Sequence, residues 1–244
     1  MKNFDALVPK RLKRCVIFTT MKKVVCFDFD NVIIDTSLAI KLLILGDKFK
    51  EFAAGIDVIF HNTEPKKFFR SIRNIIRLAK GYDIDYLRKI ILSIDMTPGT
   101  KETFSKLRKK GYKIVIASIN DKNLIRDYLK SRGLHADHIY ASELVVKNGK
   151  LTGEIKGDII KTEKVGVVKK IEKLYQVKRE NITYIGDGLT DLPIMKITGR
   201  SILFCPNALT KAEVFASKEF DKMGKEGRFF IVEKKDMREV ARLI

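Results

Sequence analysis

Three short apolar runs, each ending abruptly at a polar side chain, constrain this chain more than any other feature. The runs and the residues that follow them are Lys23–Phe27 before Asp28, Lys113–Ala117 before Ser118, and Asn181–Ile185 before Gly186 and Asp187. Apolar runs of about five residues are typical of buried strands. In open α/β sheets ligands bind at the carboxyl ends of the strands, so we expect these polar endings to form one site.

The first ending carries two carboxylates, Asp28 and Asp30, separated by one residue. Two anions this close repel each other unless a cation or a shared proton lies between them. Carboxylate oxygens suit a hard divalent ion, most often Mg²⁺. The pair is therefore a candidate metal site, and the alternative is a solvated strand end.

From Thr97 onward the pattern alternates between helix and strand, which predicts a parallel sheet with helices on both faces. The expected helices are Pro98–Lys110, Asp121–Arg132, Thr162–Tyr175, Leu209–Ala216 and one from about Lys235. Further expected strands are a brief one at His138–Tyr140, then Ser201–Phe204 and Phe229–Val232. The sequence leaves the polar stretch Lys218–Arg228 undetermined, with a long loop as one interpretation. Asn148-Gly149 is expected to be the two-residue turn of a hairpin.

The segment between the first strand and Thr97 lacks strand signals and has helical periodicity. Its apolar positions are Phe68, Phe69, Ile72, Ile75, Ile76 and Ala79, and its basic positions are Lys66, Lys67, Arg70, Arg73, Arg77 and Lys80. This pattern predicts an amphipathic helix that ends at Gly81. The basic face is either the solvated back of that helix or a site for a second anionic group of a substrate.

Taken in this order and spacing, the endings resemble the haloacid dehalogenase (HAD) superfamily of aspartate-nucleophile phosphatases. Its signature comprises Asp-x-Asp at the first strand, Ser or Thr at the second, a Lys near a helix start, and Gly-Asp-Gly-x-x-Asp at the third. The matching residues are Asp28 and Asp30, Ser118, Lys164, and Asp187 with Asp191. The hairpin between Ala141 and Gly157 is similar to that of the phosphoserine-phosphatase-like branch.

The resemblance implies an α/β fold: a doubly wound, Rossmann-like parallel-sheet core with a small helical cap inserted after the first motif. The core would comprise residues 21–31 and 97–244, and the cap residues 32–96. Residues 1–20 would be a basic N-terminal extension, or the product of a start codon assigned too far upstream, because Met21 directly precedes the first strand.

The resemblance also implies roles for the four aspartates. Asp28 would be the nucleophile that forms an aspartyl-phosphate. Asp30 would protonate the leaving group and then act as base on the hydrolytic water. Mg²⁺ would be held by the Asp28 and Asp187 side chains and the Asp30 backbone carbonyl, while Asp191 would ligate directly or orient a metal-bound water.

The remaining site residues would handle the phosphoryl charge. Ser118 would donate a hydrogen bond to a phosphoryl oxygen, and its alternative role is to cap the helix that follows. Asn31 and Asn120 are the other expected substrate-binding residues. Lys164 would shield the clustered negative charge, with Lys161, three residues earlier, as the competing candidate.

These roles describe a Mg²⁺-dependent phosphomonoesterase acting on a small phosphorylated metabolite. Asp30 argues against dehalogenation, because dehalogenase members lack that second aspartate. Two departures argue against phosphoserine as the substrate: no Glu occurs in Asp35-Thr36-Ser37, and Ser118-Ile119-Asn120 replaces Ser-Gly-Gly. A hydroxyl or sugar phosphate, or a doubly anionic compound, fits at least as well.

Composition leaves two alternatives open. A phosphotransferase of the same family would have the same motifs. The formal charge of +19 at pH 7 would attract polyanions, so nucleic-acid binding with end-phosphatase activity is a second alternative. Basic residues spread over nearly every expected helix favour a solvated, lysine-rich surface instead.

Hydropathy and cysteine content bear on the compartment. No apolar run is long enough to span a membrane, so no membrane partner is expected. The three cysteines, Cys15, Cys26 and Cys205, are scattered without metal-ligand spacing. Reduced thiols of this kind fit a cytoplasmic protein.

Overall fold

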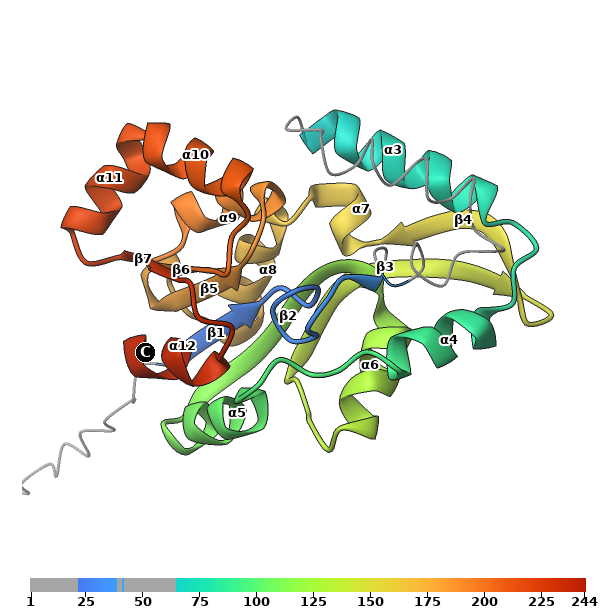
Figure 1. Cartoon of the computed structure of the whole chain (residues 1–244), viewed down its shortest axis with the longest axis horizontal. Coiled ribbons are helices and arrows are strands. Elements are labelled where there is room, and N and C mark those ends of the chain that lie inside the picture. Colours follow the sequence, from blue (N-terminus) through green and yellow to red (C-terminus); the bar gives the residue numbers. More distant parts are fainter. Residues whose placement is uncertain (1–21, 39–40, 42–64) are drawn as a thin grey trace, which may run out of the picture.

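One twisted sheet organises the chain, as the computed structural model shows for residues 22–38, 41 and 65–244, the part that it describes. Seven strands in this part follow the order β4-β3-β2-β1-β5-β6-β7 (Figure 1). They are β1 (Lys23–Phe27), β2 (Tyr112–Asp121), β3 (His138–Lys147), β4 (Lys150–Gly157), β5 (Ile182–Gly186), β6 (Arg200–Phe204) and β7 (Phe229–Val232). All neighbours pair in parallel except β3 and β4, which are antiparallel.

Helices connect the strands and cover both faces of the sheet (Figure 1). They are α3 (Pro65–Leu78), α4 (Ile84–Leu92), α5 (Thr100–Lys109), α6 (Lys122–Ser131), α7 (Asp158–Thr162), α8 (Val165–Tyr175), α9 (Leu192–Ile197), α10 (Ala208–Ala216), α11 (Lys218–Lys225) and α12 (Met237–Leu243). Two short 3₁₀ turns, η1 (Arg179–Asn181) and η2 (Leu189–Asp191), flank β5. The doubly wound α/β fold expected from the sequence is confirmed.

The central strand shows why both faces must be covered. Val25 and Phe27 of β1 pack into one apolar core together with α5, α6 and α12. The alternate residues Val24 and Cys26 pack into a second core formed with α8, α9 and α11. Since successive side chains of a strand point to opposite faces, an uninterrupted apolar run requires helices on both sides.

Three local expectations need correction, and the structure assigns one stretch that the sequence leaves open. The polar stretch Lys218–Arg228 contains helix α11, whose Phe220 and Met223 are buried. The brief strand at His138 and the first arm of the hairpin form one continuous strand, β3. Strand β2 does not stop at Ser118 but continues to Asp121 across a register shift. The helix expected over Thr162–Tyr175 is interrupted, as described below.

The hairpin turn has the geometry that its sequence predicts. Asn148 and Gly149 join β3 to β4, and both have positive φ, 52° and 76°. Lys147 pairs with Lys150 across them. Positive φ at both central residues is the type I′ pattern that matches the twist of paired strands.

The predicted cap leaves and re-enters the core at one point. Ile34 and Met96 form an antiparallel bridge. Beside it, the Asp35 amide donates to the Asp95 carbonyl at 2.9 Å, and the Thr97 amide donates to Ile33 at 3.0 Å. Residues 39–40 and 42–64 of the predicted cap lie outside the described residues, as does the predicted extension 1–20, so the domain division stays a prediction.

Helix α3 lies along the hairpin and shows the two faces that the periodicity predicts. Ile75 and Ala79 are buried, whereas Arg70, Arg73 and Arg77 are exposed. The side chains of residues 65–69 lie outside the described part. The guanidinium of Arg73 donates to the Ile160 carbonyl of α7 at 3.1 Å, so one basic residue of the exposed face links α3 to the core.

The strand order brings the three polar endings to one edge. Strand β1 lies between β2 and β5, so Asp28 after β1, Ser118 near the end of β2 and Asp187 after β5 are neighbours at the carboxyl ends of the strands. Among the described residues, no helix is long and apolar enough to cross a membrane.

A glycine at the start of α5 tests how tightly the C-terminal helix docks. Gly99 has φ 78°, and an added Cβ would lie 2.6 Å from Asp236 Oδ1 and 2.7 Å from Arg238 Cγ. Gly111, with φ 80°, has open space around the same position. We expect Gly111→Ala to lower the free energy of unfolding by about 1–2 kcal/mol through backbone strain alone. Gly99→Ala should lower it by about 1–3 kcal/mol more, because overlap with Asp236 and Arg238 adds to the same strain.

Urea denaturation of both variants measures the difference. Equal losses for the two alanines would contradict close packing of α12 on the start of α5.

Candidate active site

The end of β1 places the first carboxylate on the inside of a tight turn. The Asp28 amide continues the pairing of β1 with β5 by donating to the Ile185 carbonyl at 2.8 Å. Asp28 is 6% exposed, and its Oδ1 accepts the Phe29 amide at 2.6 Å. Phe29 is fully buried and packs edge-on against Tyr128, which anchors the turn in the core.

The end of β5 wraps around a second carboxylate. Asp191 is fully buried, and its Oδ2 accepts the amides of Asp187 and Gly188, both at 3.1 Å. A Cβ on Gly186 would lie 2.4 Å from Asp191 Cγ, so residue 186 must be glycine for the Asp191 side chain to fold back under the loop.

A buried lysine joins these two endings. Lys164 is 3% exposed, and its Nζ lies 2.7 Å from Asp28 Oδ2 and 2.6 Å from Asp191 Oδ1. The expected helix is interrupted here: α7 ends at Thr162, Glu163 has φ 56°, and α8 begins at Val165. The break places Lys164 at the junction instead of on a continuous helix face shared with Lys161, whose side chain lies outside the described part.

Charge and burial oppose each other at this junction. Burial disfavours the Lys164 ammonium, but the carboxylates of Asp191 and Asp28 outweigh it and raise the pKa of Lys164. Burial raises the pKa of Asp28, and the Lys164 charge opposes that shift. Burial, followed by repulsion from Asp191 and Asp28, raises the pKa of Asp187 well above its usual value. A cation beside Asp187 would relieve this repulsion.

The hydrogen bonds of Asp191 occupy both of its oxygens. Oδ1 accepts Lys164 Nζ and the Tyr184 hydroxyl, each at 2.6 Å, and Oδ2 accepts two backbone amides. A carboxylate offers about four lone-pair directions, so these four donors account for all of them. Direct metal ligation by Asp191 would require one donor to leave.

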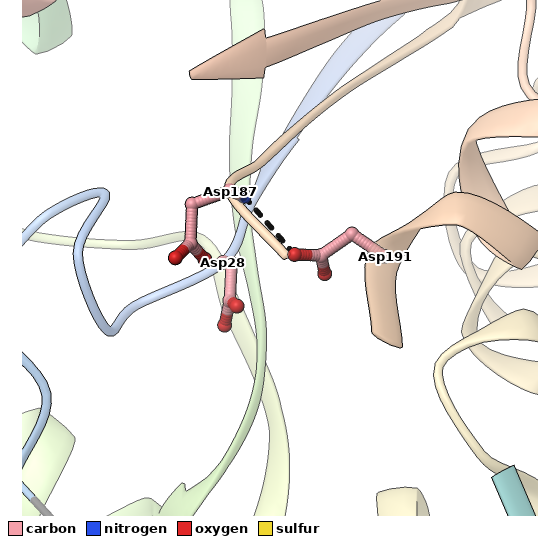
Figure 2. A group of neighbouring side chains, drawn as sticks. All are labelled: Asp28, Asp187 and Asp191. Carbon is pink, nitrogen blue, oxygen red and sulfur yellow. Dashed lines mark hydrogen bonds between the residues drawn. The ribbon is translucent and has the colours of Figure 1, made fainter. Parts of the chain in front are cut away.

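Three carboxylates nevertheless lie close enough to surround an ion. Asp28, Asp187 and Asp191 each offer an oxygen within 4.8 Å of the others (Figure 2). The side-chain amide of Asn31 donates to Asp187 Oδ2 at 3.0 Å, and the Asn31 backbone has φ 55°. The other oxygen of Asp187 has no hydrogen bond to the described residues. Hard oxygen ligands of this kind are those that Mg²⁺ prefers, so the donor set fits that ion.

Asp30 lies at the same edge but is held by different partners. It is half-buried, and the Asn120 amide nitrogen lies 2.9 Å from each of its two oxygens. The Leu38 amide also donates to Asp30 Oδ1 at 3.1 Å. Burial raises the pKa of Asp30 to about 6, although the Leu38 and Asn120 hydrogen bonds oppose the shift.

Ser118 does not cap the following helix. The α6 cap is Asp121, whose Oδ1 accepts the amides of Asn123 and Leu124 at 2.9 and 3.0 Å. The capping role considered for Ser118 is therefore wrong. Ser118 is 1% exposed, and its Oγ accepts the Asn120 amide at 3.2 Å. Its hydroxyl hydrogen has no acceptor among the described residues.

The structure thus brings together the predicted residues that the motifs contain, and it adds one residue, Tyr184, and one contact, between Asn120 and Asp30. The sequence does not predict Tyr184 at the site, because it looks like any other buried residue of the strand. Successive side chains of β5 point to opposite faces of the sheet, so Tyr184 lies on the face opposite to Ile185, where it contacts Asp191. The contact between Asn120 and Asp30 joins residues 90 positions apart, and no local sequence pattern predicts it.

Comparison with known proteins agrees with this arrangement. The family model for haloacid dehalogenase-like hydrolases matches residues 25–196. The phosphoserine phosphatase of Methanocaldococcus jannaschii is 28% identical over 232 residues, covering 91% of this chain and 98% of that protein. The probable phosphoserine phosphatase of Schizosaccharomyces pombe is 31% identical, covering 84% of this chain and 67% of that protein. A solved phosphoserine phosphatase, described as a phospho-aspartyl intermediate analogue, superposes with a TM-score of 0.74 at 26% identity, covering 92% and 99% of the two chains.

The fold and the site define a hydrolase built on a parallel sheet with an aspartate-rich edge. The chain belongs to the haloacid dehalogenase-like hydrolase family. Within that family it falls in the phosphoserine-phosphatase-like branch, and it is an enzyme of the phosphatase type.

The Tyr184 hydroxyl provides a test of how the site is held together. We expect Tyr184→Phe to lower the free energy of unfolding by about 2 kcal/mol, because it removes a hydrogen bond to the buried Asp191 carboxylate. Tyr140→Phe is the matched control, since Tyr140 is 4% exposed and its hydroxyl has no hydrogen bond to the described residues. Urea denaturation measures both. A loss no larger than that of the control would show that the hydroxyl does not support Asp191.

Proposed function

We propose that this chain is a Mg²⁺-dependent phosphomonoesterase that forms an aspartyl-phosphate on Asp28 and acts on a small phosphorylated metabolite. The convergence of Asp28, Asp187 and Lys164 at the ends of adjacent strands carries the proposal. A nucleophilic carboxylate, a cation site and a fixed positive charge are what phosphoryl transfer requires, because it depends mainly on positioning and charge neutralisation.

In the first half-reaction an Asp28 oxygen attacks phosphorus and the bond from phosphorus to the leaving oxygen breaks. Asp30 gives its proton to that oxygen. Lys164 stays within reach of the Asp28 carboxylate and lowers the cost of bringing a phosphate dianion beside it. The free hydroxyl hydrogen of Ser118 is available to a phosphoryl oxygen.

In the second half-reaction water attacks the phosphorus of the aspartyl-phosphate and the bond to Asp28 breaks. Asp30, now a carboxylate, takes the proton of the water, which returns both aspartates to their starting state. Mg²⁺, when bound, neutralises the phosphoryl oxygens. Asp28 and Asp187 with the Asp30 backbone carbonyl would hold it, and Asp191, whose lone pairs are filled, would orient the surrounding groups.

The substrate is proposed as a class. The relatives named phosphoserine phosphatase support a small phosphate monoester. The absence of a Glu among Asp35-Thr36-Ser37, and Ser118-Ile119-Asn120 in place of Ser-Gly-Gly, support a compound other than phosphoserine. We propose a hydroxyl or sugar phosphate.

Phosphate release from a panel of esters tests the proposal. The panel contains p-nitrophenyl phosphate, phosphoserine, sugar phosphates and doubly phosphorylated compounds, each with Mg²⁺ and with EDTA. We expect Mg²⁺-dependent release that falls by about 10³-fold or more in Asp28→Asn, because the nucleophile is lost. Asp127→Asn, which alters a surface aspartate of α6, is the control and should keep full activity. Release that survives in Asp28→Asn, or in EDTA, would contradict the mechanism.

A further inference from the structure

The Asp30 carboxylate is held between two segments that are remote from each other in sequence. Leu38 approaches it from the start of the inserted segment, with its amide 3.1 Å from Oδ1. Asn120 approaches from the end of β2, with its side-chain nitrogen 2.9 Å from both Oδ1 and Oδ2. Asn120 faces both oxygens, while the Leu38 amide binds Oδ1 alone, so the two donors together fix the position and the plane of the carboxylate.

Asn120 is itself anchored. Its backbone amide donates to Ser118 Oγ at 3.2 Å. The next residue, Asp121, caps α6 and also accepts the Leu144 amide of β3 at 2.8 Å. The last residues of β2, from Ser118 to Asp121, are therefore tied to β3 and α6, which gives Asn120 little freedom to turn away from Asp30.

The chemistry of the pair decides which way the amide faces. An ionised carboxylate only accepts hydrogen bonds, so the NH₂ end of Asn120 must point to Asp30 and its carbonyl oxygen away. With a proton on Asp30 Oδ2, Oδ1 still accepts both Leu38 and Asn120. A neutral amide can thus hold the carboxyl group in place before and after proton transfer. A lysine in the same position would favour the ionised form of Asp30, because its charge stabilises a carboxylate.

We propose that Asn120 is a positioning residue that aims the Asp30 carboxyl group at the leaving-group oxygen. The inference rests on the proposed function of Asp30 as the proton donor. It reassigns Asn120, which the sequence alone places among the substrate-binding residues. Oδ1 accepts from two donors and Oδ2 from Asn120 alone, so the proposal assigns the transferred proton to Oδ2.

Two aryl esters of similar shape separate positioning from binding. Phenyl phosphate has a basic leaving oxygen that needs a proton as the bond breaks, whereas p-nitrophenyl phosphate has a leaving oxygen that departs readily without one. The kcat/KM of each ester reports the steps up to formation of the phosphoenzyme. Loss of proton transfer from Asp30 should therefore affect phenyl phosphate far more than p-nitrophenyl phosphate.

We expect Asn120→Ala to lower kcat/KM for phenyl phosphate by about 10²-fold and for p-nitrophenyl phosphate by less than about 5-fold. Asn120→Leu keeps nearly the same size and removes the donor without adding a charge, so it should show the same selective loss, and it carries the test if the alanine variant does not fold. Asn123→Ala, which truncates an exposed asparagine in the first turn of α6, is the control and should leave both values unchanged.

A double-mutant cycle completes the test. In an Asp30→Asn background, Asn120→Ala should add almost no further loss for phenyl phosphate, because the group that it positions is gone. Equal losses for both esters, or losses that add in the double variant, would overturn the proposal and return Asn120 to substrate binding. Failure of the proposed function is separate: it would appear as wild-type protein without phosphate release, or as activity retained in Asp28→Asn.

Discussion

A buried ammonium between two carboxylates is the interaction on which the rest of the site depends. Lys164 contacts Asp28 on one side and Asp191 on the other, and all three side chains are almost completely buried. Removing one partner of such a group leaves an uncompensated buried charge, which costs about 3–5 kcal/mol. Two local features allow this contact. The interruption of the helix at Glu163 places Lys164 between the carboxylates, and Gly186 leaves room for the Asp191 side chain.

The four aspartates at this edge differ because their neighbours differ. Asp28 faces the lysine, Asp191 is saturated by four donors, and Asp187 keeps one oxygen without a hydrogen bond to the described residues. Asp30 faces an amide and a backbone N–H instead of a charge. These different environments support the proposed roles of nucleophile, structural anchor, cation ligand and proton carrier, since the environment of each carboxylate sets its chemistry.

Much of this arrangement could be predicted from the sequence, because it follows from local patterns. Apolar runs of five residues give the central strands, and their polar endings give Asp28, Ser118 and Asp187 a common edge once the sheet is parallel. The Asn148-Gly149 turn is likewise set by two residues that accept positive φ.

The features that the sequence does not predict depend on tertiary contacts. Helix α11 lies in a stretch that the sequence leaves undetermined, because only Phe220 and Met223 face the core in eight residues. The interruption before α8 is stabilised by the ion pairs of Lys164, which helical periodicity does not report. The approach of Asn120 to Asp30 depends on how β2 continues beyond Ser118, and side-chain partners 90 residues apart leave no local signal.

We propose that Asp28, held by Lys164, becomes covalently phosphorylated during turnover. Rapid acid quench of the wild-type enzyme with p-nitrophenyl phosphate and Mg²⁺, followed by peptide mass spectrometry, tests it directly. We expect a phosphoryl group on the peptide that contains Asp28, located on that residue and absent when Asp28 is replaced by Asn. Turnover with no phosphorylated peptide at any quench time, or with the phosphoryl group on another residue, would contradict it.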